Sequence, residues 1–254
     1  MDAGRLDRLP GFRRCFIVTS GEGWVRAEVE DDYHCMGVTI RHDEGVATRV
    51  EPAMDRAPWT TCPGALARLE ETFTNIPLED FPRQGQRSSN CTHLHDLAML
   101  AAAHAGDSAP LVYDIVVSDP IDGESGAQLR RNGEVVLEWV QRDGLIVQPT
   151  ELAGLALDKL RAWIDGLDPE RQEQARILRW GAMMAHGRAM PLWDASSLAG
   201  NCYTFQPHIR GEARRIGEIK DFSIGTARPL EGRRTAQAVD RRWTEEAQPQ
   251  GGQR

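Results

Sequence analysis

Four side chains that bind metals or transfer protons lie within the six residues Cys91-Thr92-His93-Leu94-His95-Asp96. Thiolate and imidazole groups are ligands that zinc accepts, and they also act as nucleophile and base. The apolar spacing that follows predicts a helix over Thr92 to Ala105. At about 100° per residue, His93 falls on the core-facing side of this helix, whereas His95 and Asp96 point away from it. His93 is therefore the imidazole that we expect to face the protein interior.

Cys62 and Cys91 each stand immediately before a predicted helix, which for Cys62 covers Ala65 to Thr72. Unpaired N–H groups and the positive end of the helix dipole favour a thiolate at such a position. We therefore expect these two thiols to be the reactive ones. Cys15 and Cys35 lie inside strand patterns, and we expect them to be small buried hydrophobic residues.

Three interpretations of these residues remain open. In the first, Cys62, Cys91 and His93 hold zinc or iron, with His34 as a further ligand; Cys91 must then precede the helix, since two positions within a helix diverge by about 200°. In the second, Cys91 or Cys62 is a nucleophile and His93 or His34 is its base. In the third, His93 is a hydrogen-bonded interior histidine and both cysteines are buried helix-end residues. His34 belongs with this group because the alternation from Tyr33 to Arg41 places it on a strand face with apolar residues.

These residues lie in a strand meander that is followed by two helices, and this order of predicted elements occurs twice along the chain. Alternating apolar residues and turn signals predict an antiparallel meander of four strands over 12–19, 24–30, 33–41 and 45–50, followed by the two helices. Further strands are predicted over 112–117, 128–130, 134–140 and 144–148, with helices over 151–166 and from 169 to about 189. The fold class is therefore α+β, with strand meanders that are each followed by two helices. Two hypotheses explain the order: an internal duplication, or one α+β domain with a mixed core.

We predict three segments. Residues 1–106 form the first strand meander and two helices with the Cys/His motif, residues 107–194 form the second strand meander and two helices, and residues 195–254 form an extended segment and tail. Tyr203 and Gln206 lie in a polar and aromatic segment that we expect to close over a pocket. Beyond Arg210 the chain is arginine-rich and poor in large apolar residues, and we expect disorder from about Arg233.

Composition excludes several classes of protein. The 254 residues include 30 basic and 38 acidic side chains, a formal charge of -8 without a basic cluster, so we expect no nucleic-acid partner. No apolar stretch approaches the length of a membrane span. Five cysteines, an odd number, without an export signal favour free thiols or metal ligands in a cytoplasmic protein. The chain also contains neither a phosphate-binding P-loop nor a Gly-x-Ser-x-Gly elbow.

Two motifs, Arg56-Ala57-Pro58-Trp59-Thr60-Thr61-Cys62-Pro63-Gly64-Ala65 and Cys91-Thr92-His93-Leu94, resemble those of a bacterial family of proteins of unknown function. In that family a strand-rich start, a Cys-Pro turn into a helix and a Cys-Thr-His-Leu helix opening follow in this order. The resemblance covers about Phe12 to Ala105, and residues 77–87 depart from the family pattern. The family has no established activity, so the resemblance singles out Cys62, Cys91 and His93 without naming their task.

We expect a small-molecule catabolic enzyme, a lyase, hydrolase or isomerase, with a pocket between the first strand meander and the helix from Thr92. Its site would use Cys91 and Cys62 as metal ligands or thiolate, His93 as ligand or base, and His34 as a second base. The alternative hypothesis is a non-enzymatic metal or iron–sulfur scaffold, or an accessory protein that transfers a group to a partner enzyme. The oligomeric state is left undetermined.

Overall fold

A single antiparallel sheet of eight strands forms the centre of the protein, in the order β4-β3-β2-β1-β5-β6-β7-β8. It is seen in a computed structural model that describes residues 5–188, 200–216, 219–225 and 227–234. The protein is therefore mixed α+β, as predicted. The strands are β1 (Gly11–Gly21), β2 (Trp24–Asp31), β3 (Cys35–Asp43), β4 (Val46–Arg56), β5 (Leu111–Ser118), β6 (Glu124–Arg131), β7 (Glu134–Arg142) and β8 (Leu145–Gln148).

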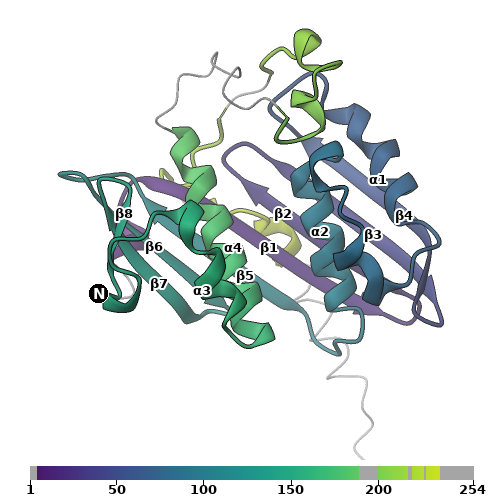
Figure 1. The fold of residues 1–254 in the computed structure, drawn as a ribbon, viewed down its shortest axis with the longest axis horizontal. Helices are drawn as coiled ribbons and strands as arrows, with labels where there is room; N and C mark the ends of the chain where they lie inside the picture. The colour runs from purple at the N-terminus through teal and green to yellow at the C-terminus, as the bar shows by residue number, and fades with distance from the viewer. Residues whose placement is uncertain (1–4, 189–199, 217–218, 226, 235–254) are drawn as a thin grey trace, which may run out of the picture.

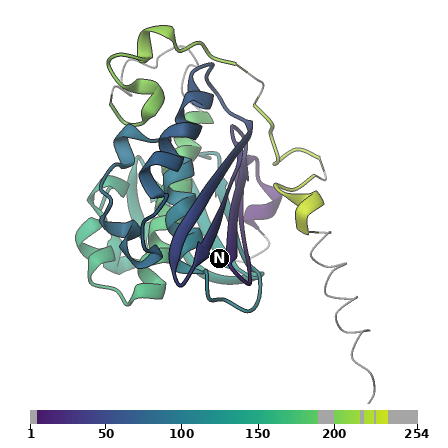
Figure 2. The same cartoon turned by 90° about the vertical axis from the view of Figure 1, so that its right-hand side faces the viewer.

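The helices named α1 to α4 cover the same face of the sheet (Figures 1 and 2). Helices α1 (Ala65–Phe73) and α2 (Thr92–Ala103) pack on β2, β3 and β4, whereas α3 (Arg161–Asp165) and α4 (Pro169–Ala185) lie over the half that contains β5, β6 and β7. Within the part of the chain that the structure describes, no helix has the length and apolarity that a bilayer span requires.

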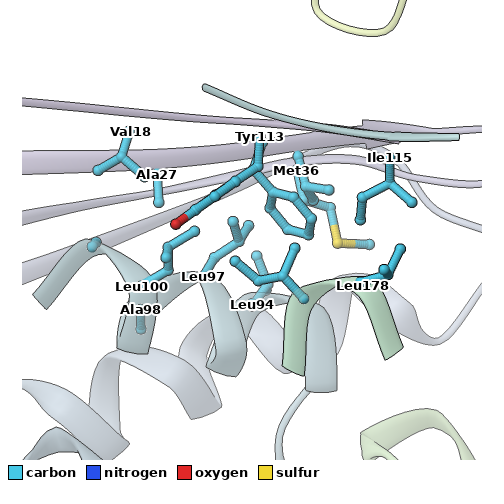
Figure 3. Close-up of a cluster of buried hydrophobic side chains, with 14 of the residues drawn as sticks. Val18, Ala27, Met36, Leu94, Leu97, Ala98, Leu100, Tyr113, Ile115 and Leu178 are labelled. Carbon is cyan, nitrogen blue, oxygen red and sulfur yellow. The ribbon is translucent and has the colours of Figure 1, made fainter. Parts of the chain in front are cut away.

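The hydrophobic core lies between the sheet and this helical layer. Strand residues that face the helices, such as Val18, Ala27 and Tyr113, meet the inward side of α2 at Leu94 and Leu97 (Figure 3). These side chains are almost fully buried, and burial of a leucine-sized side chain contributes about 1.5–3 kcal/mol. Because one cluster of contacts extends over both groups of strands, the helical faces are held at a fixed position above the sheet.

The pairing of β1 with β5 joins the two predicted segments, 1–106 and 107–194, into one sheet. They pair antiparallel along all of β5, from Gly11 opposite Ser118 to Val18 opposite Leu111. As a result, the starts of β1 and β6 and the ends of β2 and β5 lie at the same end of the sheet.

The predicted helix over 151–166 is wrong. The chain there makes isolated turns of 3-10 helix at Thr150–Leu152 and Leu157–Lys159, and only Arg161–Asp165 is α-helical. Gly154 adopts a positive φ of 84°, which ends a right-handed helix. Ala156 is extended, so the apolar spacing reflects separate contacts with the core. The helix from Pro169 ends at Ala185, earlier than the predicted end near 189.

The C-terminal segment crosses the face of the sheet that the helices leave open (Figure 2). Leu230 is buried against Cys15 and Ile17 of β1, and Arg234 pairs with Asp114 of β5. Residues 233 and 234, which we expected to begin a disordered tail, therefore make defined contacts. The rest of that predicted tail, 235–254, lies outside the described residues.

Candidate functional site

A buried ion pair between Arg14 and Asp31 lies at the centre of the candidate site. The two residues are direct partners in the register of β1 and β2, on the helix-facing side of the sheet. Nε and Nη2 of Arg14 donate to Oδ2 of Asp31 at 2.8 and 2.5 Å, and neither side chain is exposed. The guanidinium carbon lies 4.6 Å from the ring centre of Trp180 on α4. A charged pair is therefore held under the helices by hydrogen bonds and an aromatic face.

Asp31 also shapes the turn that presents His34. Its Oδ1 accepts hydrogen bonds from the backbone N–H groups of Tyr33 and His34 at 2.7 and 2.8 Å. The same oxygen lies 3.0 Å from Nδ1 of His34. Burial disfavours the charged carboxylate, but Arg14 and His34 outweigh that effect and hold the pKa of Asp31 well below its usual range. Asp31 is thus an ionised carboxylate that orients the His34 imidazole.

His93, at the second position of α2, stacks on His34. The ring centroids are 3.8 Å apart with an interplanar angle of 27°, and Nε2 of His93 lies 3.0 Å from Nη2 of Arg14. A guanidinium only donates hydrogen bonds, so this nitrogen is an acceptor and the ring proton belongs on Nδ1. Burial, His34 and Arg14 lower the pKa of His93 well below its usual value, and the ring is neutral at pH 7. The prediction that His93 points inward is confirmed.

The donor atoms of Asp31, His34 and His93 lie within 4.8 Å of one another, a spacing at which a metal ion can be held. Two histidines and a carboxylate are a ligand set that non-haem iron uses. However, Nη2 of Arg14 lies against both Asp31 and His93, and arginine keeps its positive charge at all relevant pH values. A metal would have to displace this cation, so the arrangement fits proton transfer better than metal binding.

Three buried polar atoms around the ion pair have no hydrogen-bond partner among the described residues: Nη1 of Arg14, Oδ1 of Asp32 and the hydroxyl of Tyr33. Buried polar groups in native proteins are normally bonded to protein, water or ligand. Arg215, from the segment after α4, lies over the ring of Tyr33 at 5.6 Å. Nη1 of Arg14 is thus an unpaired donor inside the buried cluster.

The predicted cysteines lie in a different cluster from the two histidines. The Sγ atom of Cys62 is 3.4 Å from Oγ1 of Thr204, and the N–H of Tyr203 bonds to the carbonyl of Asn90, beside Cys91. This arrangement brings Cys202 towards both predicted thiols. Among the described residues, no group of three that includes a cysteine is as compact as Asp31, His34 and His93.

Burial opposes the thiolates that the helix N-termini were expected to favour. It raises the pKa of the Cys91 thiol to about 12 and also raises that of Cys62. Cys91 does precede α2, as its N-cap, without a side-chain capping bond. The loss of water around the sulfur thus outweighs the dipole of the helix. Both thiols are protonated at neutral pH in this arrangement.

The prediction that His95 points away from the core is wrong. The helical wheel placed it away from the core, yet it is buried and its ring lies 5.2 Å from that of Phe73 on α1. The reason is that α1 and the turn Leu78–Arg83 cover this side of α2, so that α2 has two buried faces. Asp96 instead pairs with Arg87 at the surface, as its predicted direction requires.

Sequence reasoning missed Arg14, Asp31, Trp180 and Cys202 as neighbours of the predicted residues. An arginine at an inward position of an otherwise apolar strand was the available signal for Arg14, since Phe12 and Phe16 flank it on the same face. Asp31 and Trp180 carried no comparable signal, because their roles depend on strand register and on the position of α4.

No protein-family model matches this chain. No curated protein matches it either. A solved chain described as a viral glycoprotein is 14% identical, with 72% of this chain and 60% of that chain covered, at a TM-score of 0.20. The present chain thus spans about three fifths of that structure's length, and a likeness at this score carries no argument about fold or function.

Proposed function

We propose that the protein is a small-molecule catabolic enzyme that transfers protons, a lyase or isomerase, with His34 as its base. The observation that carries this proposal is the 3.0 Å contact between Nδ1 of His34 and Oδ1 of Asp31. An ionised carboxylate on one imidazole nitrogen fixes the ring and makes the other nitrogen, Nε2, the basic one. No described residue hydrogen-bonds to this Nε2.

The neighbouring groups complement such a base. Nη1 of Arg14 is an unpaired cationic donor, suited to a carbonyl or carboxylate oxygen on which negative charge develops when a proton leaves the adjacent carbon. His93 is a neutral imidazole with its proton on Nδ1, as the Arg14 contact requires. A hydrolase with Cys62 or Cys91 as nucleophile is less well supported, because burial keeps both thiols protonated.

Proton exchange tests this function before any product is identified. The full chain is incubated in deuterium oxide with a panel of keto acids and hydroxy acids, and deuterium uptake at carbon is followed by mass spectrometry. Uptake by a panel member should fall by at least ~10²-fold in His34→Gln, the typical contribution of a general base. His104→Gln is the matched control, since Nδ1 of His104 also contacts an aspartate, Asp107 at 2.7 Å, far from the site. Absence of exchange on every compound, or equal exchange in His34→Gln, would contradict the proposal.

A non-enzymatic metal or iron–sulfur scaffold is the second candidate function. It is favoured by the approach of Cys202 to Cys62 and Cys91, because Cys62 and Cys202 both lie close enough to Cys91 to add to the effect of burial in raising its pKa. The ligand set predicted from the sequence was Cys62, Cys91 and His93; because His93 lies in the other cluster, zinc or iron would here be held by Cys62 and Cys91 with Cys202 in place of His93. Metal analysis of chelator-free protein distinguishes the candidates: stoichiometric metal that is lost in Cys91→Ser and kept in Cys35→Ser supports the scaffold.

We further propose that the two halves of the chain descend from an internal duplication. The strand order is symmetric about the β1–β5 pair, and each half places its longer helix on the sheet, α2 over β2 and β3 and α4 over β5 and β6. We also propose a cytoplasmic location, because the chain has an odd number of cysteines. A small molecule, not a nucleic acid, is the proposed partner, because the formal charge is -8.

A further inference from the structure

A cleft of about 650 Å³ lies between the last turn of α4 and the strand ends of β5, β6 and β7. Its volume is within the range of small-molecule sites, about 300–1,000 Å³. Gln141 and Ser125 line its sheet side, and Arg188 lines it after α4. The cleft is separate from the thiols and from the groups assigned to proton transfer, so its function is a separate question.

Carboxylates outnumber cations around this cleft. Arg188 contacts three of them: Asp32, Asp119 at 2.9 Å and Asp221 at 2.8 Å. Asp143 lines the cleft as well and forms no ion pair with a described residue. Even when Asp32 is protonated, three carboxylates face one guanidinium, and the opening has a net negative charge. The remaining titratable group among the described lining residues is His186.

Gln141 provides independent evidence that the cleft takes a ligand. Its side chain is on the helix-facing side of β7, two residues after the core residue Trp139, and only 4% of it is exposed. No described residue hydrogen-bonds to its amide, although it lines the cleft. The amide is therefore an unpartnered polar group at the wall of the cleft, and a bound polar group would pair with it. The amide oxygen of Gln141 adds a hydrogen-bond acceptor to the carboxylates of Asp119, Asp143 and Asp221 that also line the cleft.

We propose that this cleft binds a small organic cation with N–H donors, a primary ammonium or a guanidinium group. The carboxylates of Asp119, Asp143 and Asp221 and the amide oxygen of Gln141 all accept hydrogen bonds, which such a cation supplies. A quaternary ammonium lacks N–H groups and is recognised by aromatic faces. No aromatic ring is among the described residues that line the cleft, so the acceptors select N–H cations over quaternary ones.

Isothermal titration of the full chain tests this assignment. The probes are n-butylammonium and n-butylguanidinium, with tetramethylammonium and n-butyrate for comparison. We expect saturable one-to-one binding of at least one N–H cation, at least ~10-fold tighter than tetramethylammonium, and no binding of butyrate. Absence of saturable binding of both N–H cations, or equal binding of tetramethylammonium or butyrate, would overturn the proposal.

Variants locate the binding in the cleft. Gln141→Met keeps the side-chain length and removes the amide, and we expect it to weaken the N–H cation by ~10-fold. Asp143→Asn at the exposed rim should also weaken it and is tolerated by the fold, because asparagine accepts the left-handed φ of 51° at this position. Asp165→Asn, on the surface of α3, is the matched control. Thermal unfolding checks each variant; if Gln141→Met is unfolded, Asp143→Asn decides. Equal weakening by Asp165→Asn would show general charge attraction and refute the site.

Discussion

His34 and His93 stack with ring centroids 3.8 Å apart, although they come from a β-turn and from a helix 59 positions further along the chain. Two imidazolium rings at this distance would repel each other, and Arg14 adds a third positive charge. The pair therefore keeps at least one ring neutral. Burial, His34 and Arg14 together assign the neutral state to His93, since they lower its pKa.

The lowered pKa of His93 predicts a pH-dependent stability. The folded state disfavours protonation, so this contribution is fully present above the ordinary histidine pKa of 6.5 and is lost as the pH falls below it. The difference in unfolding free energy between wild type and His93→Gln should shrink from pH 7 to pH 5, as measured by urea denaturation.

His104→Gln provides a control of opposite sign. Burial opposes the charge of His104, but Glu173 and Asp107 outweigh it and raise the pKa. Its contribution is therefore present at low pH and is lost as the pH rises through the raised value. Parallel pH dependences of the two variants would contradict the assignment of His93 as neutral.

The Arg14–Asp31 pair should show strong energetic coupling. Arg14→Met leaves a buried carboxylate without its cation, and Asp31→Asn leaves a buried guanidinium without its counter-charge, so each should destabilise by ~3–5 kcal/mol. The double variant should cost less than the sum of the two by more than ~1 kcal/mol, measured by denaturant unfolding. The exposed pair Arg142 and Glu124, at 2.7 Å, is the comparison and should couple by less than ~1 kcal/mol. Additive effects of Arg14→Met and Asp31→Asn would show that the buried contact contributes nothing specific.

Alkylation distinguishes a buried thiol from a catalytic thiolate at Cys91. With a pKa of about 12, roughly 10⁻⁴ of the thiol is ionised at pH 8, and iodoacetamide should modify it slowly in the folded protein. Cys35, half-buried with a pKa of about 11, should react faster, and both should react rapidly in denaturant. Peptide mass spectrometry follows each site. Fast, selective modification of Cys91 in the folded protein would restore the nucleophile hypothesis.

The contact of the C-terminal segment with the open face of the sheet should stabilise the fold. Leu230 is 4% exposed against Cys15 and Ile17, and Leu230→Ala should cost ~2 kcal/mol or more. Ile224→Ala, at a side chain that is 70% exposed, should change stability by less than ~0.5 kcal/mol. Thermal or urea unfolding measures both, and equal effects would show that Leu230 is not anchored on β1.

Local patterns predicted most of the strands and the starts of three of the four helices. Alternation of apolar residues depends on which sheet face is buried, and that information is local. The first three strands were therefore predicted to within two residues at each end, whereas β4 continues to Arg56, six residues beyond the predicted end at Val50. The helix over 151–166 was wrong because the apolar spacing there was satisfied by separate turns. His95 was misplaced because a wheel drawn for one helix does not include the second helix that covers it.

Periodicity and turn signals in the sequence are sufficient to predict the mixed α+β class, the position of Cys91 before a helix and the inward direction of His93. The stacking of His34 on His93, the pairing of Arg14 with Asp31 beside them, and the separation of the thiols from both are visible only in the folded protein. Those contacts depend on the register of β1 with β2 and on the docking of α2 and α4 on the sheet. Register and docking are set by the summed burial of the whole core, to which every helix and strand contributes and which no short segment specifies.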